Sequence, residues 1–317
     1  MEPMSQIIQG FARSPRLADA ERRVEQLAND PLVRKFRLKY PEIDDHTLKL
    51  NLSKLYLHVK EMGNCAKCPG LDKCPNDFEG HYTMLSADQA GGFWQIYDRK
   101  VACKKQVAKE KQDVIRKRIR SFYVDERALA EGYAFGDIVD TDLERADAIE
   151  QLMIYIQRTK SDGLQPEGLF LTGDHGRGKT FLVSYMLFEL AKSGFSGVIV
   201  YMPDFVEDLK AMISEPVKLK EMVETLKEAD LLVFDDVGAE NLTPWVRDHV
   251  LGTILNYRMN RKPTFYTSNH SLEGFEKHLC FTSKDGEEEY KGRRLMERIR
   301  PFVEVIHVGG SNKRGKS

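Results

Sequence analysis

Residues 173–180, GDHGRGKT, constrain the fold of this chain more than any other segment. They match the pattern G-x-x-x-x-G-K-T, follow the apolar run GLFLT and open the apolar stretch FLVSYMLFELAK. A strand, a glycine-rich loop and a helix in this order let backbone N–H groups surround phosphate oxygens at the positive end of a helix dipole. The pattern predicts a nucleotide-binding loop made of Gly173, Asp174, His175, Gly176, Arg177, Gly178, Lys179, Thr180 and Phe181.

The chemistry of ATP assigns a role to several of these residues. We expect Lys179 to reach the β- and γ-phosphates and the Thr180 hydroxyl to bind Mg²⁺. About fifty residues later, LLVFDD ends a second apolar run with two carboxylates. Asp235 is expected to hold Mg²⁺ and Asp236 to orient or deprotonate the attacking water. The alternatives are a decorative glycine-rich turn and a solvated strand end, and the pairing of the two motifs favours ATP and Mg²⁺.

A third polar residue follows another apolar run, PTFYTSN. Asn269, at its end, is placed to position water against the γ-phosphate. The alternative is that its side chain only closes an Asx turn.

Five β-branched runs predict the sheet: GLFLTG, GVIVYM, LLVFDDV, PTFYTSN and FVEVIHV. Helical stretches separate them, which is typical of an α/β fold with a mostly parallel sheet and helices on both faces. We therefore expect a five-stranded P-loop ATPase domain over residues 131–317, joined by a basic linker, residues 104–130, to a separate domain of residues 1–103.

The expected N-terminal domain combines helices with a cysteine cluster. Residues 18–62 carry apolar residues at helical spacing, and four of the five cysteines of the chain lie between Cys65 and Cys103. In a reducing compartment such clustering favours Zn²⁺ over disulfides. A tetrahedral site takes four ligands, and spacing leaves open which four of these five candidates supply them: Cys65, Cys68, Cys74, His81 and Cys103. The alternative is a set of free buried cysteines beside a surface histidine.

Charge and hydropathy exclude few functions. The 48 Lys and Arg residues nearly balance the 49 Asp and Glu residues, so any nucleic-acid surface must be local. The basic segment from Arg116 to Arg120 and the basic C-terminus are two such surfaces, although each is also explained as a solvated charge run. No stretch is long and apolar enough to span a membrane, and a cytoplasmic location is expected.

The three motifs, in this order and spacing, resemble the first nucleotide motif, the second motif and sensor-1 of AAA+ proteins. More narrowly, the chain resembles the DnaI/DnaC family of helicase loaders, through its cysteine-rich N-terminal module, VYMPDFVEDLK, DDVGAENLTPWVRDHVLGTILNYRM and RLMERI. The resemblance implies an ATP-dependent loader that grips the hexameric replicative helicase through its N-terminal domain. It also implies contact with single-stranded DNA and self-association on the helicase.

Two further residues are carried over from the family pattern. Arg298 matches the arginine finger, which would reach a neighbouring subunit's γ-phosphate and make hydrolysis depend on assembly. Its alternative is a solvated basic helix face, since Arg293, Arg294 and Arg300 crowd the same segment. Arg314 lies near the sensor-2 position. Asp236 departs from the broader AAA+ pattern, which has glutamate there, so water activation is expected to be slow.

Two other functions stand beside the helicase loader. A transposition-helper ATPase shares the compact AAA+ core and acts on double-stranded DNA. A metal-dependent binding module with a degenerate nucleotide site is the second, and the intact Lys179, Thr180 and Asp235 disfavour it.

Overall fold

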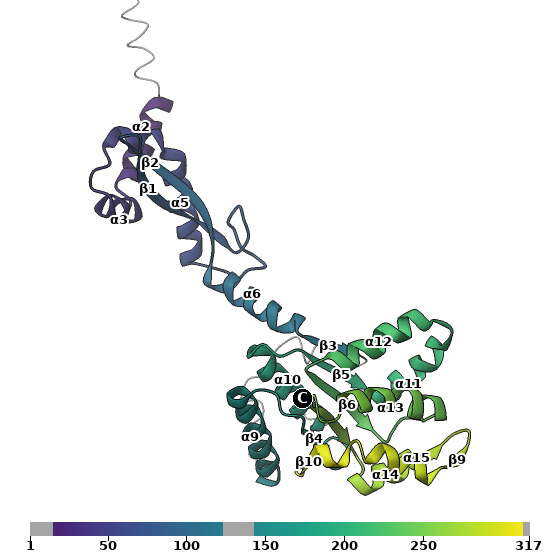
Figure 1. Ribbon diagram of the computed structural model, residues 1–317. Helices are drawn as coiled ribbons and strands as arrows, with labels where there is room; N and C mark the ends of the chain where they lie inside the picture. The colour runs from purple at the N-terminus through teal and green to yellow at the C-terminus, as the bar shows by residue number, and fades with distance from the viewer. Residues whose placement is uncertain (1–14, 123–142, 313–317) are drawn as a thin grey trace, which may run out of the picture. The chain divides into compact units, whose positions relative to one another are not determined.

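A computed structural model describes residues 15–122 and 143–312 of the chain (Figure 1). The chain divides into two compact units, Met1–Lys111 and Gln112–Ser317. Within the described residues, no helix is long and apolar enough to cross a membrane.

The N-terminal unit begins with the helices that its apolar spacing predicts. Aspartates cap two of them: the Asp30 and Asp44 carboxylates accept hydrogen bonds of 2.8 Å from the backbone N–H groups of Leu32 and Thr47. The four helices are α2 (Pro15–Ala28), α3 (Pro31–Lys39), α4 (Asp45–Leu50) and α5 (Leu52–Ala66).

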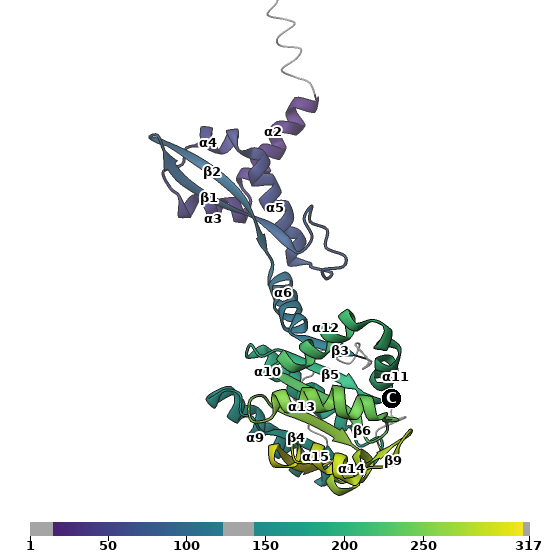
Figure 2. The same cartoon turned by 45° about the vertical axis from the view of Figure 1, so that its right-hand side comes forward.

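An antiparallel hairpin follows, so the unit expected to combine helices with a cysteine cluster also contains a two-stranded sheet. Strands β1 (His81–Ala90) and β2 (Phe93–Ala102) pair along their whole length, as Figure 2 shows. Gly91 and Gly92 form the turn with φ angles of 61° and 83°, values that suit a two-residue hairpin loop. The Gly-Gly pair between two ten-residue runs was the sequence signal for this hairpin.

Helices and hairpin share a small core. Its buried apolar side chains come from α3, the segment that follows it, α4, α5 and both strands: Val33, Phe36, Ile43, Leu48, Leu55, Leu85 and Ile96. Glu61 of α5 is fully buried beside this core and accepts hydrogen bonds from the N–H and hydroxyl of Thr83, at 2.6 and 2.7 Å. The Lys100 ammonium of β2 also bonds to this carboxylate, so one buried charge joins the helix to both strands.

Of the expected basic linker, residues 104–130, the structure describes residues 104–122, which form a helix and a strand, and residues 123–130 lie outside the described ranges. Helix α6 spans Lys104–Lys117, and β3 (Ile119–Phe122) joins the sheet of the C-terminal unit beside β5 (Gly197–Tyr201). The Arg118 guanidinium donates a 2.9 Å hydrogen bond to the Ala191 carbonyl. Residues 118–122 therefore belong to the C-terminal unit, and the expected five-stranded sheet has six strands.

The six-stranded sheet is parallel, in the order β10-β4-β7-β6-β5-β3. The five strands expected from the apolar runs are all present. Besides β5 they are β4 (Gly168–Thr172), β6 (Leu231–Val237), β7 (Thr264–Ser268) and β10 (Val303–His307).

Helices cover both faces of this sheet (Figure 1). Alternate residues of each strand enter different cores: Phe234 and Tyr266 pack on one face, Val233 and Phe265 on the other. The second face carries α9 (Ala146–Asp162) and α10 (Lys179–Lys192). The first carries α11 (Met202–Ala211), α12 (Pro216–Glu228), the π-helix η3 (Val246–Leu251), α13 (Gly252–Arg258), α14 (Leu272–Cys280) and α15 (Glu289–Met296).

Short elements complete the unit. They are η1 (Leu143–Arg145), η2 (Met212–Ser214), the β8–β9 hairpin (Phe281–Thr282 with Gly286–Glu287) and η4 (Arg300–Phe302).

Candidate nucleotide-binding site

The glycine-rich loop lies between the carboxyl end of β4 and the first turn of α10. Gly176 and Gly178 have φ angles of 76° and 81°, and Gly178 is the residue that precedes α10. Glycine adopts this left-handed conformation without the steric cost that other residues carry. A β-carbon on Gly173 would lie 2.4 Å from the Val308 carbonyl oxygen, so the loop also packs tightly against the segment after β10.

A cavity of about 360 Å³ opens beside this loop. It brings together residues that the sequence placed in three motifs, because the carboxyl ends of β4, β6 and β7 meet at one edge of the sheet. The lining residues are His175, Gly176, Gly178, Lys179, Thr180, Phe181, Tyr201, Asp235, Asp236, Thr267 and Asn269.

Lys179 is buried at the centre of the loop. Its ammonium donates hydrogen bonds to the carbonyls of Gly173 and Asp174, at 2.6 and 2.9 Å, and to the Asn269 side-chain oxygen at 2.8 Å. These three acceptors are neutral oxygens. A phosphate group brought to this loop would offer the ammonium a charged acceptor in their place.

Asp235 lies beside Thr180 with only 3% of its surface exposed. The Thr180 hydroxyl is 3.0 and 3.1 Å from its two carboxylate oxygens, and the Thr267 hydroxyl donates to the carboxylate at 2.6 Å. Burial raises the pKa of Asp235, the two hydroxyls oppose that rise, and the nearby Asp236 carboxylate adds to it. A hydroxyl and a carboxylate side by side are oxygen ligands that suit Mg²⁺.

Asp236 adopts a left-handed backbone with φ of 58°, which is uncommon for a residue with a side chain. Its N–H donates to the Thr267 hydroxyl at 2.9 Å, and its carboxylate accepts from the Asn269 amide at 2.8 Å. These bonds hold the strained turn, whose cost is of order 1–3 kcal/mol. Asn269 therefore links the cation of the loop to the second carboxylate of β6.

Several residues near the site escaped the sequence analysis. Thr267 lies in β7, two positions before Asn269. The alternation of side chains along a strand therefore assigns both to the same face at the carboxyl end of the sheet. Arg145, a buried residue, lies next to the loop: its guanidinium is 3.0 Å from the position of a β-carbon on Gly178. A β-carbon on Gly176 would likewise lie 2.1 Å from the side-chain oxygen of Asn312. No motif in the sequence marks Arg145 or Asn312, and Tyr201 lies in the family segment VYMPDFVEDLK without a role assigned to it.

Of the two arginines carried over from the family pattern, Arg298 is not among the residues that line this cavity. Arg298 follows α15 and lines another cavity, together with Arg294 and Lys291. Arg314 falls outside the described residues.

All five candidate zinc ligands line one cavity of about 590 Å³ in the N-terminal unit. Three thiols accept hydrogen bonds: Cys74 from the Gly80 N–H and Cys103 from the Gln106 N–H, both at 3.4 Å, and Cys65 from the Asn76 amide at 3.5 Å. As placed, however, no three His, Cys, Asp or Glu side chains of residues 15–122 and 143–312 converge closely enough to hold a metal ion. The cavity gathers the candidates without forming a coordination site.

The parallel sheet, the glycine-rich loop and the carboxylate pair define a class: an α/β P-loop ATP-binding protein of the AAA+ type. Two family profiles match the chain: "Primosomal protein DnaI N-terminus" over residues 1–90 and "IstB-like ATP binding protein" over residues 101–316. The replicative helicase loader DnaI of Bacillus subtilis is 32% identical over 320 residues, which cover 99% of both chains. This chain belongs to the DnaI family.

Solved structures agree with this assignment. A crystal structure of DnaI has 32% identity and a TM-score of 0.53, and covers 61% of this chain and 98% of that one. A primosome component from Streptococcus pyogenes has 31% identity and a TM-score of 0.51, covering 64% of this chain and 100% of that one. An IS21-like ATP-binding protein of Bacteroides fragilis is more distant, at 25% identity over 55% of this chain and 62% of its own length.

Proposed function

We propose that this chain is an ATP-dependent loader of a replicative DNA helicase. The observation that carries the proposal is full-length similarity to a helicase loader combined with an intact nucleotide cavity. ATP binds in the cavity beside Gly176, and the useful output is a rearrangement of protein and DNA partners. The chemistry of the site serves as a switch for that rearrangement.

Hydrolysis follows from the roles of the cavity residues. Lys179 would exchange its carbonyl partners for the β- and γ-phosphates, and Thr180 and Asp235 would hold Mg²⁺. Asp236 orients the attacking water, and Asn269 positions that water between the carboxylate and the γ-phosphate. Arg298 reaches the γ-phosphate of a neighbouring copy, so that hydrolysis requires assembly. Bound Mg²⁺ supplies charge stabilisation for the phosphate oxygens.

The N-terminal unit is the part that grips the helicase hexamer. It has its own buried core and matches the DnaI N-terminal profile over residues 1–90. Several large apolar side chains of this unit are exposed, among them Leu38, Leu50 and Phe93. Single-stranded DNA is the proposed template, in keeping with the family.

Zinc belongs to the same proposal as a structural element. All four thiols line one cavity, and burial there raises the pKa of Cys65. His81 bonds the Glu79 carbonyl through Nδ1, at 2.8 Å, which leaves Nε2 as its candidate ligand atom. We propose that the four thiolates bind Zn²⁺ and shape the docking surface, with no role in hydrolysis.

A helicase-loading assay tests the proposed function. The full chain should place the replicative helicase of its host on circular single-stranded DNA in the presence of ATP, and Lys179→Ala should lose both nucleotide binding and loading. Residues 1–111 should capture the helicase without ATP. An unaffected Lys179→Ala variant, or capture by residues 112–317 alone, would contradict the assignment of the two units.

A transposition-helper function is the second candidate, because the IstB-like profile matches residues 101–316. The N-terminal profile and the full-length relative favour the loader. Binding to double-stranded DNA with no affinity for the helicase would favour the helper.

A further inference from the structure

The two carboxylates of the nucleotide cavity lie on a β-bulge of β6. The pairing register of β6 with β7 shifts between Phe234 and Val237. Asp235 and Asp236 therefore face the single residue Thr267 of β7. Bulges occur next to active sites, where they re-aim a side chain, and they are rare between parallel strands. With φ at 58°, Asp236 has a backbone that ordinarily suits glycine, so the surrounding residues must hold it there.

A buried side chain, Glu240, closes the turn that leaves this bulge. Its carboxylate accepts a 2.7 Å hydrogen bond from the Gly238 N–H, two residues earlier, and bonds to Nε2 of His278 at 3.0 Å. Each carboxylate oxygen takes one of these two bonds, which offset the cost of burying the group. Glu240 is 4% exposed and is not among the described residues that line the nucleotide cavity.

The turn after β6 packs directly against the segment after β7. Gly238 has φ of 95°, and a β-carbon on it would lie 2.5 Å from the His270 ring. The Ser268 hydroxyl donates to the Val237 carbonyl at 2.6 Å and accepts from the His270 N–H at 3.1 Å. His270 follows Asn269 in the chain. The turn that carries one carboxylate is therefore in contact with the segment that carries the amide.

Helix α14 connects His278 back to the nucleotide cavity. It begins at Leu272, shortly after Asn269, and His278 lies in its last turn. The contacts form a closed ring: Asn269 bonds to Asp236, the turn leads from Asp236 to Glu240, and Glu240 bonds to His278, from which α14 returns to Asn269. The position of the Asp236 carboxylate thus depends on both bonds of the ring.

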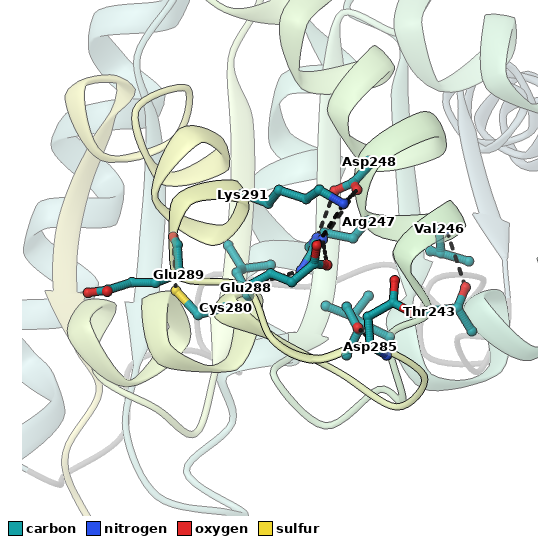
Figure 3. A network of polar contacts seen from close by, with 12 residues as sticks. Thr243, Val246, Arg247, Asp248, Cys280, Asp285, Glu288, Glu289 and Lys291 are labelled. Carbon is teal, nitrogen blue, oxygen red and sulfur yellow. Dashed lines mark hydrogen bonds and ion pairs between the residues drawn. The ribbon is translucent and has the colours of Figure 1, made fainter.

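A second anchor holds the same loop farther along the chain (Figure 3). Arg247 of η3 is 0% exposed, and its guanidinium donates to the Leu279 carbonyl at 3.4 Å and to Glu288 at 2.6 Å. Leu279 follows His278 in α14, so the loop of residues 238–248 is fixed to this helix at two adjacent positions. The Arg247 anchor should keep α14 in place when the contact with Glu240 is removed.

We propose that Glu240 is a positioning residue for Asp236. Its bonds to Gly238 and His278 hold the bulge in the conformation that aims the Asp236 carboxylate at the attacking water. The inference rests on the proposed function and adds to it a residue that acts on hydrolysis without touching ATP. The bond inside the turn distinguishes this role from general support of the fold, because it fixes the backbone two residues from Asp236.

Hydrolysis, and not ATP binding, should depend on this bond. Without the carboxylate, the Gly238 N–H loses this acceptor, so the turn can relax toward an ordinary backbone and move Asp236. Asp235 is held separately, by the hydroxyls of Thr180 and Thr267. The proposed Mg²⁺ ligands and the glycine-rich loop therefore keep their places.

Steady-state ATPase kinetics of the full chain, at one protein concentration, test the role. Glu240→Ala should lower kcat at least about tenfold and change KM for ATP less than about threefold. Glu240→Gln should stay within about threefold of the wild-type kcat, because its amide still offers an oxygen to the Gly238 N–H and a donor to His278. Glu189→Ala, the control, removes a partly buried carboxylate paired with Lys160 at 2.9 Å and should keep the wild-type kcat.

His278→Ala reaches the same carboxylate from outside the loop. The His278 side chain is 22% exposed, so its truncation leaves a small cavity at the surface of α14. The kcat of this variant should fall at least about threefold. It also carries the test if Glu240→Ala does not fold. Wild-type kcat in His278→Ala, or in a folded Glu240→Ala, overturns the inference.

A double-mutant cycle separates positioning from general stability. In a chain that already carries Asp236→Ala, Glu240→Ala has no carboxylate left to position, so it should lower the residual rate less than about twofold. The same tenfold loss in that background would mean that Glu240 supports the fold in general, and the inference would be wrong.

Failure of this inference differs from failure of the proposed function. If Asp236→Ala lowers the rate of hydrolysis and Glu240→Ala does not, the inference alone is wrong. If Asp236→Ala or Lys179→Ala hydrolyses ATP like the wild type, the roles assigned to the nucleotide cavity are wrong, and the inference falls with them.

Discussion

The Asn269 side chain accepts a hydrogen bond from Lys179 at 2.8 Å and donates one to Asp236, also at 2.8 Å. This single amide joins the residue expected to hold the phosphates to the residue expected to orient water. A change at Asn269 is expected to affect hydrolysis more than ATP binding, because the uncharged amide leaves the charge of the site unaltered.

Asn269→Ala should lower the rate of hydrolysis about a hundredfold and change ATP affinity less than about threefold. The loss of the amide leaves the Asp236 carboxylate without its donor, while Lys179 keeps its two carbonyl partners. Steady-state ATPase kinetics and nucleotide titration measure the two effects. Asn241→Ala, at an exposed position that does not line the cavity, is the control. A parallel loss of affinity and rate would contradict the assigned role.

Asp235 should destabilise the nucleotide-free protein at neutral pH. Burial raises its pKa, so the folded state binds the proton more tightly than the unfolded state does, and stability falls as the pH rises above the ordinary range of an aspartate. Asp235→Asn removes this dependence, and its midpoint of thermal unfolding at pH 7 should be higher by at least about 2 °C. Mg²⁺ with ATP should stabilise the wild type more than the variant. If the wild type and Asp235→Asn have equal midpoints of thermal unfolding across pH 4–8, Asp235 does not have this effect.

Glu61 should hold the N-terminal unit together in a pH-dependent way. Burial disfavours its charge, but Lys100 and Thr83 outweigh burial and lower the pKa of this carboxyl. A lowered folded-state pKa gives stability that is present above the unfolded value, near 4.5, and is lost as pH falls through the folded value. Glu61→Ala leaves Lys100 without this partner and should cost about 3 kcal/mol in residues 1–111 at pH 7. Denaturant unfolding measures this, and Glu25→Ala on the surface should cost nothing measurable.

Zinc analysis of single variants shows whether the four thiols or His81 bind the metal. Wild-type protein should carry about one equivalent of zinc per chain, and Cys65→Ser should lose it. Cys280→Ala should keep the metal because Cys280 lies in the C-terminal unit, and His81→Ala should keep it because the four thiolates of the proposal fill a tetrahedral site without His81. Chelation should lower the thermal stability of residues 1–111 and spare residues 112–317. Metal retained by Cys65→Ser would exclude that thiol as a ligand.

Local patterns were sufficient for much of the C-terminal unit. The loop of residues 173–180, the five apolar runs and the paired acids predicted the strands β4, β5, β6, β7 and β10 and the edge where their polar ends gather. This succeeds because a buried parallel strand needs a continuous apolar run, and because a phosphate loop needs glycines at positions with left-handed backbone.

Tertiary structure decided what depends on partners distant in sequence. Strand β3 is only four residues long and lies in a basic segment, so its sequence does not predict a strand. Its pairing with β5 in the folded chain defines it. The hairpin of residues 81–102 alternates weakly, since much of β2 is exposed, and Glu61 supplies part of its support from α5. Four crowded arginines are equivalent in the sequence; only the carboxylates of α14 and α15 separate Arg293 and Arg300 from Arg294 and Arg298. Charge pairing across elements is a property of packing, and no local pattern encodes it.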